Sequence, residues 1–187
     1  MRKNKSQSMV EKMCKDSSER ILYTFANEDT YLEKLVDFIS KGLVQGEYVL
    51  IVESRRNIPL LRCKLESILN EEEQSRVQFV NNYDYFFLNG SLHPSAIYNY
   101  FASLIGSLKG EENNFRTWMH VEWGHEQELI SQIEEFEANT DEMTAGTGIT
   151  SVYAYNSEWL SRDLKTMLQE CHTHHVTDWN FLNHTQA

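Results

Sequence analysis

The sequence predicts a three-layer α/β fold, in which a mainly parallel sheet of about five to six strands has helices on both faces. Three observations predict it. Short apolar segments alternate five times with helical segments, and each connection is long enough for the crossover of a right-handed βαβ unit. The segment at residues 47–53 is apolar without alternation in its middle, as in strands covered on both faces. The chain of 187 residues is long enough for one such domain.

Each strand is expected where an apolar run meets a turn or a capping residue. The expected strands are residues 20–25, 47–53, 76–81, 115–121 and 149–155, with a short sixth strand at residues 176–182. The order of strands and helices along the chain is therefore the order of a doubly wound sheet.

The helices are expected between these strands, from their capping residues and apolar spacing. Asn27 can cap the first helix, which ends at Gly42 or Gly46, and Pro59 opens the second near its first turn. The second helix has an apolar stripe of Leu60, Leu61, Leu65, Ile68 and Leu69, and acidic residues 71–73 end it in solvent. Later helices are expected at residues 95–108, 125–143 and 157–170, with a loop at residues 82–94.

No repeat or break in composition divides the chain into two domains. We expect residues 1–18 to be a disordered basic tail and residues 19–187 to be a single domain. The three cysteines form no C-x-x-C pair, and an odd number is a poor disulfide framework, so a reducing cytoplasm is expected. No apolar run suits a signal peptide or a membrane span.

The charge balance argues against nucleic acid as a partner. The 28 Asp and Glu residues outnumber the 17 Lys and Arg residues, which gives a formal net charge of −11. Binding to nucleic acid needs Lys and Arg clustered on one face, and only the tail has more basic than acidic residues.

A phosphate-binding loop is also missing. The first strand runs directly into residues 26–29 (ANED), whereas a phosphate loop needs glycines and, in its Walker form, a Lys followed by Ser or Thr. The close glycine pair at residues 144–148 (TAGTG) follows a helix and precedes a strand, which is the wrong order for a phosphate cradle. ATP hydrolysis by the usual route is not expected.

Two other kinds of chemistry are weighed and not favoured. Residues 171–175 (CHTHH) contain ligand types for zinc or copper, but no second pair at metal-ligand spacing exists, so no metal or cofactor is expected. His120 and Glu122 suggest an acid/base pair, yet alternation along the strand is expected to point them to opposite faces, and no nucleophile is identifiable. We therefore expect no enzyme.

The carboxyl ends of the expected strands are rich in aromatic and amide side chains, and open α/β sheets bind ligands at that edge. The residues there with pocket-forming side chains are Phe25, Asn27, Glu53, Glu122, Trp123 and Tyr155. This mixture suits a mostly apolar pocket with a few polar anchors. The alternative is that the aromatic side chains fill the core beneath the loops.

Several segments, taken in order, resemble the MEDS domain, the sensory domain of methanogens, methylotrophs and the DcmR-type regulator. They are residues 21–28 (ILYTFANE), Tyr31-Leu32, Phe38-Ile39, residues 42–52 (GLVQGEYVLIV), Arg116 with residues 120–123 (HVEW), Glu137, residues 152–155 (VYAY), and one of His172, His174 and His175. The resemblance covers residues 20–176. Val152 departs from the pattern, because the family often has a cysteine there.

The resemblance implies a RecA/KaiC-like α/β unit without a working phosphate loop, and a bacterial regulatory sensor that binds small organic ligands. Glu53, Glu122 and His174 would then be polar contacts of the ligand. With no output domain expected, the sensor would signal to a separate protein such as a histidine kinase, an anti-sigma factor or a transcription regulator. A homodimer is also compatible with it.

The partner surface is expected on the acidic helix at residues 125–143, with Glu134, Glu135 and Glu137 as its contacts; a solvated acidic face is the alternative. A second hypothesis is a ligand-free interaction protein that antagonises a kinase or a transcription factor. A metal-dependent enzyme is the third.

Overall fold

A computed structural model describes residues 20–87, 93–108, 114–122, 133, 135, 149–178 and 181–183. These residues form a seven-stranded sheet in the order β3-β2-β4-β5-β1-β6-β7. The strands are β1 (Arg20–Phe25), β2 (Tyr48–Glu53), β3 (Val77–Asn81), β4 (Phe115–His120), β5 (Thr150–Asn156), β6 (His174–Thr177) and β7 (Phe181–Asn183). All neighbouring strands are parallel except β6 and β7, which are antiparallel. The predicted α/β class with a mainly parallel sheet is confirmed.

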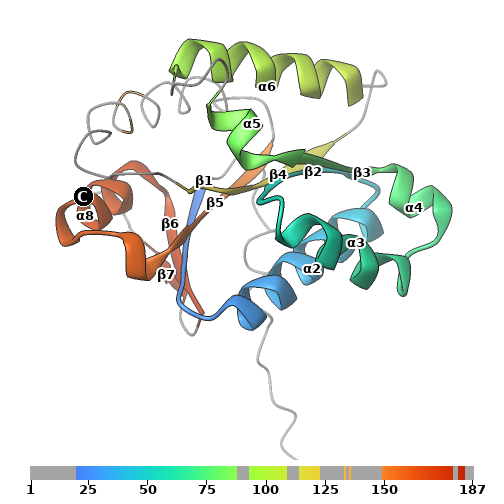
Figure 1. The fold of residues 1–187 in the computed structure, drawn as a ribbon, viewed down its shortest axis with the longest axis horizontal. Helices are drawn as coiled ribbons and strands as arrows, with labels where there is room; N and C mark the ends of the chain where they lie inside the picture. The colour runs from blue at the N-terminus through green and yellow to red at the C-terminus, as the bar shows by residue number, and fades with distance from the viewer. Residues whose placement is uncertain are drawn as a thin grey trace, which may run out of the picture.

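Helices cover both faces of the sheet (Figure 1). Below it in that view lie α2 (Glu28–Val44) and α3 (Asn57–Glu66), and above it lie α5 (Asn82–Phe86) and α6 (Pro94–Leu108). The other helices are α4 (Glu71–Ser75), the 3-10 turn η2 (Ser157–Trp159) and α8 (Arg162–Cys171). Leu164 and Leu168 of α8 belong to the same buried cluster as Phe86 of α5 and Ile97 of α6.

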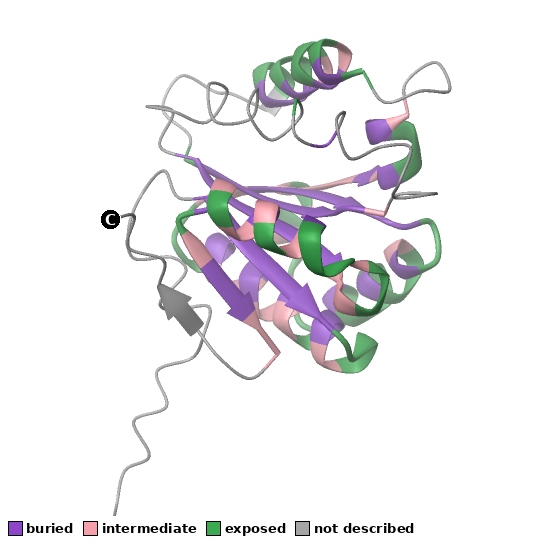
Figure 2. Ribbon diagram, turned by 90° about the vertical axis from the view of Figure 1, so that its left-hand side faces the viewer, coloured by how far each residue is buried: buried purple, intermediate pink, exposed green. Residues whose placement is uncertain are grey.

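The core has two apolar clusters separated by the sheet. On the α2 side the strands contribute Ile21, Val49, Ile51, Trp118 and Val152, and on the α6 side they contribute Leu22, Leu50, Val52, Met119 and Tyr153. These residues alternate along each strand, because successive side chains of a strand point to opposite faces. Figure 2 shows the strands almost wholly buried beneath the half-exposed helices. Burial on both faces explains why the residues of β2 show no polar alternation.

Both ends of α2 follow the capping rules used above. Asn27 caps α2 through its side-chain oxygen, which accepts a hydrogen bond from the Thr30 N–H at 2.8 Å, as predicted. Gly46 has φ of +79° in the turn between α2 and β2, a conformation that favours glycine.

Four details of the sequence prediction were wrong. Asn70 begins the separate helix α4 with a capping box, so residues 71–73 do not end the preceding helix. Residues 82–86 form α5 rather than a loop, because the Asn81 side chain caps them. Leu60 and Ile68 are about half exposed and so lie outside the buried stripe of α3. The last expected strand is a hairpin of two strands, β6 and β7.

Two predictions lie outside the described residues. The basic tail at residues 1–18 is one, and most of the acidic helix at residues 125–143 is the other. Within the latter, Ile133 is buried, and both it and the exposed Glu135 are helical.

Candidate functional site at the carboxyl edge of the sheet

The carboxyl ends of β2 and β4 bring two charged side chains together on the α2 side of the sheet. Glu53 follows Val49 and Ile51 on the same face of β2, and His120 follows Trp118 on the same face of β4. Val52 pairs with Met119 in the register of the two strands, so Glu53 and His120 come next and lie side by side. Both are buried, Glu53 completely and His120 to 3% exposure.

Glu53 accepts hydrogen bonds at both carboxylate oxygens. Its Oε1 lies 2.5 Å from Nδ1 of His120, 2.6 Å from the Ser54 N–H and 3.3 Å from Nδ2 of Asn57. Its Oε2 accepts from the hydroxyl of Tyr31 on α2, and that hydroxyl accepts in turn from Nε1 of Trp118 at 3.1 Å. Both carboxylate oxygens of Glu53 are therefore satisfied by donors of the protein itself.

The two charges stabilise each other. Burial alone would raise the pKa of Glu53, but the hydrogen bond and charge of His120, with the bonds from Tyr31 and the Ser54 N–H, hold it below its ordinary value. Burial alone would lower the pKa of His120, but the bond and charge of Glu53, followed by the charge of Glu122, raise it above 6.5. The charge of Arg56 opposes that rise. Both shifts favour the charged forms, a carboxylate on Glu53 and an imidazolium on His120.

The other ring nitrogen of His120 faces Glu122. Its Nε2 lies 3.9 Å from Glu122 Oε1, which is too long for a hydrogen bond. Asn82 at the start of α5 donates to Glu122 Oε2 at 2.7 Å and to the His120 carbonyl at 3.3 Å. The expectation that His120 and Glu122 point to opposite faces was wrong: residues two apart in an extended chain share a face.

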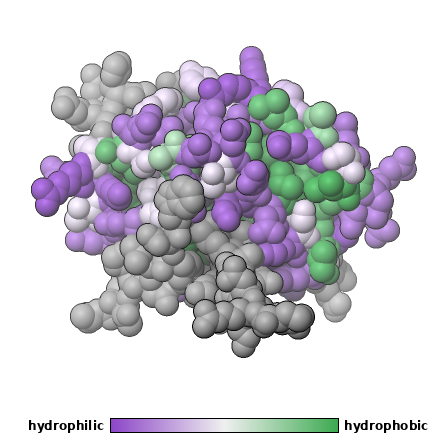
Figure 3. Space-filling view, turned by 90° about the horizontal axis from the view of Figure 1, so that it is seen from below, coloured by the Kyte–Doolittle hydropathy of each residue, from purple (hydrophilic) through white to green (hydrophobic). Residues whose placement is uncertain are grey.

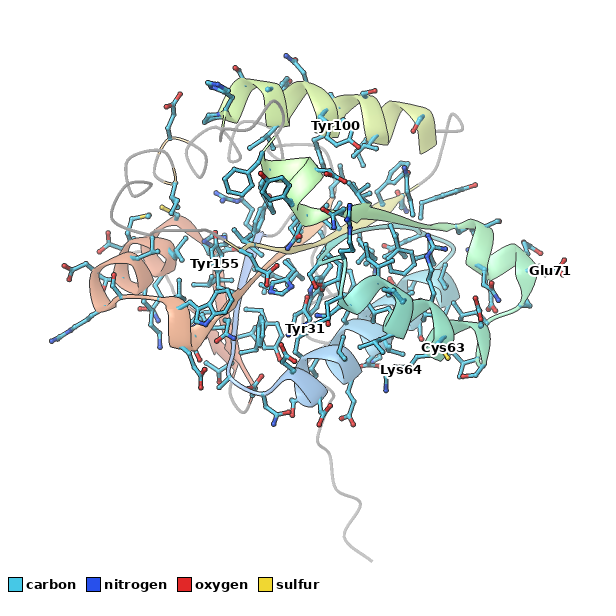
Figure 4. All side chains as sticks on the ribbon, in the orientation of Figure 1. Tyr31, Cys63, Lys64, Glu71, Tyr100 and Tyr155 are labelled. Carbon is cyan, nitrogen blue, oxygen red and sulfur yellow. The ribbon has the colours of Figure 1, made fainter. Side chains whose placement is uncertain are left out.

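The aromatic rings of Phe25 and Tyr31 enclose the buried side of this network. Their ring centres lie 4.2 Å apart, and the ring of Phe25 meets that of His120 edge-on at 5.4 Å. Figure 4 shows Tyr31 between α2 and the sheet. Phe25 is only 2% exposed, so it packs against the network from within.

The remaining residues predicted for the site lie apart from this network. Tyr155 belongs to the apolar cluster on the opposite face of the sheet. Asn27 is exposed and caps α2. His174 pairs with Ile21 near the amino end of β1, so it lies toward the other edge of the sheet. Trp123, Glu134 and Glu137 lie outside the described residues, and Glu135 is exposed.

Sequence reasoning missed Tyr31, Asn57 and Trp118 as members of the network. Each belongs to a helix or a strand, and there an aromatic side chain is expected to pack in the core and an amide side chain to cap a helix. Asn82 was expected as the first residue of the loop at residues 82–94. The signal that could have found them is the acidic residue at the end of an apolar strand, because a buried carboxylate needs donors around it.

The junction between β1 and α2, where a phosphate loop would lie, is filled by a carboxylate of the chain itself. Asp178 Oδ2 accepts from the backbone N–H groups of Ala26 at 2.9 Å and Asn27 at 3.2 Å, and Oδ1 accepts from the Tyr23 hydroxyl at 2.6 Å. These are the donors that the start of a helix offers to an anion. Burial and Asp178 together raise the pKa of Tyr23, so its hydroxyl keeps its proton.

Within the described ranges, no group of three or more His, Cys, Asp and Glu side chains could hold a metal ion. Cys171 ends α8 and His175 lies on β6, so these two residues do not share a helix face. No helix in the described part of the chain is long and apolar enough to cross a membrane.

Comparison with known families decides the relationship. Residues 21–175 match the profile of MEDS, the methanogen/methylotroph, DcmR sensory domain. The chain belongs to the MEDS family. The resemblance drawn from the sequence is thereby confirmed, and membership points to a sensory role. No curated protein matches the chain significantly.

Solved structures show the same fold as this MEDS domain. A KaiC-like protein from the hyperthermophilic archaeon Pyrococcus horikoshii OT3 is 15% identical with a TM-score of 0.54, over 86% of this chain and 71% of the other. A second protein from Pyrococcus horikoshii OT3 is 12% identical with a TM-score of 0.53, over 90% and 86% of the two chains. The predicted RecA/KaiC-like fold is thus confirmed.

Parts of three of the segments that resemble MEDS meet at the amino edge of the sheet. Arg116, at the start of β4, is 1% exposed and forms an ion pair with Glu47. It also donates to the Phe38 carbonyl at 3.1 Å and to Gln45 Oε1 at 3.0 Å. Gly42 lies against it, because a Cβ there would be 2.6 Å from Arg116 Cδ and Nε. These contacts therefore hold α2 to the sheet at the end of β4 opposite to His120.

Proposed function

We propose that this MEDS domain is a non-catalytic sensor that binds a small organic molecule at the carboxyl edge of its sheet and regulates a partner protein. Its ligand contacts are His120 and Glu122, with Asn82 holding Glu122 in place and Glu53 holding His120. The partner is a regulatory protein such as a histidine kinase, an anti-sigma factor or a transcription regulator. The expected location is the cytoplasm.

The observation that supports this proposal is the buried Glu53–His120 pair. Removing two charges from water costs several kcal/mol for each ion, about as much as their attraction returns, so apolar residues of similar volume would serve the fold equally well. A buried pair with shifted pKa values at a sheet edge where ligands bind therefore favours a binding role.

A binding role is favoured over catalysis by what surrounds His120. Among the described residues, its ring nitrogens face only the carboxylates Glu53 and Glu122, and no Ser, Thr or Cys side chain forms a hydrogen bond with it. Cys63 is exposed on α3, on the outer side of that helix (Figure 4). A nucleophile activated by this histidine is therefore not part of the proposal.

The test is native mass spectrometry of the purified protein, followed by thermal-shift measurements with a panel of metabolites. A ligand that binds only the folded protein at about 100 times its Kd stabilises it by about 2.7 kcal/mol. Glu122→Ala should abolish most of that shift, and Glu170→Ala, which removes an exposed carboxylate of α8, should leave it unchanged. A full panel without any stabilising compound would contradict the proposal.

A second candidate function, a ligand-free interaction protein, is favoured by the surface of α2 and α3. Val44 is 85% exposed, Ile68 56% and Leu60 50%. Figure 3 shows hydrophobic side chains gathered toward one end of this face. Such a patch is typical of a surface that contacts another protein. An empty protein that responds to no small molecule but loses partner binding in Ile68→Ser would support it.

A further inference from the structure

The gap between His120 and Glu122 is the feature that the fold leaves unexplained. His120 is 3% exposed and Nδ1 is bonded to Glu53, yet Nε2 has no hydrogen bond within the described residues and points at a carboxylate oxygen 3.9 Å away. Glu122 Oε2 is already held by Asn82 at 2.7 Å, which leaves Oε1 facing the ring. A donor and an acceptor separated by more than 3.5 Å leave room for a water molecule or another polar group that bridges them.

The geometry defines that group. An oxygen atom about 2.8 Å from both Nε2 and Oε1 would see them about 90° apart, which suits an oxygen that accepts one hydrogen bond and donates another. The His120 ring lies between the carboxylates of Glu53 and Glu122. Burial and the charge of Arg56 lower its pKa, but the hydrogen bond and charge of Glu53 and the charge of Glu122 outweigh them and raise it, which favours the imidazolium form, whose Nε2 donates. Oε1 of Glu122 can only accept.

We propose that His120 Nε2 and Glu122 Oε1 form a two-point site for the hydroxyl group of a small alcohol. The alcohol oxygen accepts from His120 and donates to Glu122, replacing a water molecule while reproducing both of its hydrogen bonds. This inference rests on the proposed ligand-binding function and names the chemical class of the ligand.

Other ligand groups fit the two atoms less well. A carboxylate or phosphate would be repelled by the negative charge of Glu122, and an ammonium group would be repelled by the positive charge of the imidazolium. An ether or a ketone can accept a hydrogen bond from His120 but has no donor for Glu122. It would therefore lose one of the two hydrogen bonds made by the water that it displaces.

The carbon part of the alcohol enters from the side of Glu122. The Glu122 side chain is 31% exposed, whereas the His120 side chain is 4% exposed and is covered from within by Phe25 and Tyr31. Asn82 makes the site rigid, because its amide donates both to the His120 carbonyl and to Glu122. The site is therefore formed before the ligand arrives, which reduces the entropy lost on binding.

The test is a titration of the ¹⁵N-labelled protein with ethanol, followed through the Nε2 resonance of His120. Dimethyl ether, which has the same atoms but no hydroxyl, is the matched ligand, and acetamide tests a group that donates and accepts at separate atoms. For a ligand with only three non-hydrogen atoms the expected Kd is about millimolar or weaker. Ethanol should shift the resonance saturably, and dimethyl ether should not.

Two variants keep the result interpretable. Glu122→Gln should weaken ethanol binding about tenfold or more, and Glu170→Gln, which makes the same charge change at an exposed position of α8, should leave it unchanged. Because Glu122 is partly exposed, its amide variant is expected to fold, and the unchanged backbone spectrum would check that.

Three results would overturn the inference. Equal responses to ethanol and the ether would show apolar contact without a hydroxyl site, and a stronger response to acetamide would assign the site to amides. A metabolite that stabilises the protein without moving the His120 resonance would place the ligand elsewhere and leave the proposed sensor function standing. Failure of every compound in the thermal-shift panel would remove both proposals together.

Discussion

Replacing Gly42 by alanine tests how α2 is held to the sheet, because two effects of opposite sign compete there. In a helix interior, alanine is more favourable than glycine by about 1 kcal/mol. The added Cβ, however, would lie 2.6 Å from Cδ and Nε of Arg116, closer than such atoms approach. Either the helix or the buried arginine must move.

The contacts of Arg116 decide the magnitude. Its Nε, one of the two atoms in conflict, is the atom that donates to Glu47, so displacing it weakens the ion pair directly. Breaking a buried pair costs about 3–5 kcal/mol, and overpacking alone costs about 1–3 kcal/mol. After subtracting about 1 kcal/mol for helix propensity, we expect Gly42→Ala to lower the free energy of unfolding by about 2–4 kcal/mol.

Urea denaturation followed by tryptophan fluorescence and circular dichroism measures this change. Gly106→Ala is the matched control: Gly106 lies in α6, and nothing within 4 Å would meet its Cβ. That variant should gain about 0.5–1 kcal/mol from helix propensity alone. If Gly42→Ala is stabilised to the same extent, Arg116 is not packed against α2 and the reasoning fails.

Three further predictions concern the carboxyl edge. Asp178→Ala should lower the free energy of unfolding by about 1–3 kcal/mol, because the Tyr23 hydroxyl and two N–H groups at the start of α2 lose their acceptor. Urea denaturation checks this, and an unchanged midpoint would contradict it. The Glu53–His120 pair should make stability fall on both sides of neutral pH. The lowered pKa of Glu53 contributes stability that is lost as pH falls through it. The raised pKa of His120 contributes stability that is complete below about 6.5 and lost as pH rises through the folded value, by at most about 1.4 kcal/mol per pH unit. His120→Gln should reduce the fall of the free energy of unfolding with rising pH on the alkaline side of the curve. An unchanged slope there would show that another group causes the fall. Tyr31→Phe should cost about 1–3 kcal/mol, because Glu53 loses a buried donor, and thermal denaturation measures it; no loss would show that the carboxylate does not need this bond.

The sequence was informative about the strands and helices because their signals are local. The apolar run of β2 and the capping Asn27 of α2 depend on neighbours a few residues away, so both were predictable. The helix α5 was missed because its five residues contain aromatic side chains and no apolar stripe, and only the cap at Asn81 indicates it. Short helices are set by such caps and by packing more than by periodicity.

The candidate site was only half predictable, because its contacts are long-range. Glu53 and Glu122 could be placed at strand ends from the pattern alone. That Glu53 meets His120, 67 residues later in the chain, follows only from the strand order β2-β4, which the sequence pattern does not give. Tyr155 was grouped with Phe25 because both lie at the end of a strand. In the structure Phe25 faces α2, whereas Tyr155 faces the apolar cluster that includes α8.

The arrangement of charges separates this domain from phosphate-binding proteins of similar architecture. At the junction of β1 and α2 the backbone donors are taken by Asp178, so an incoming anion would have to displace a carboxylate that makes three hydrogen bonds. The site proposed for the ligand lies at the carboxyl end of β4, where His120 and Glu122 face each other across 3.9 Å. A donor and an acceptor at that spacing would favour an uncharged polar group over a phosphate, which is the selectivity that the proposed sensor function requires.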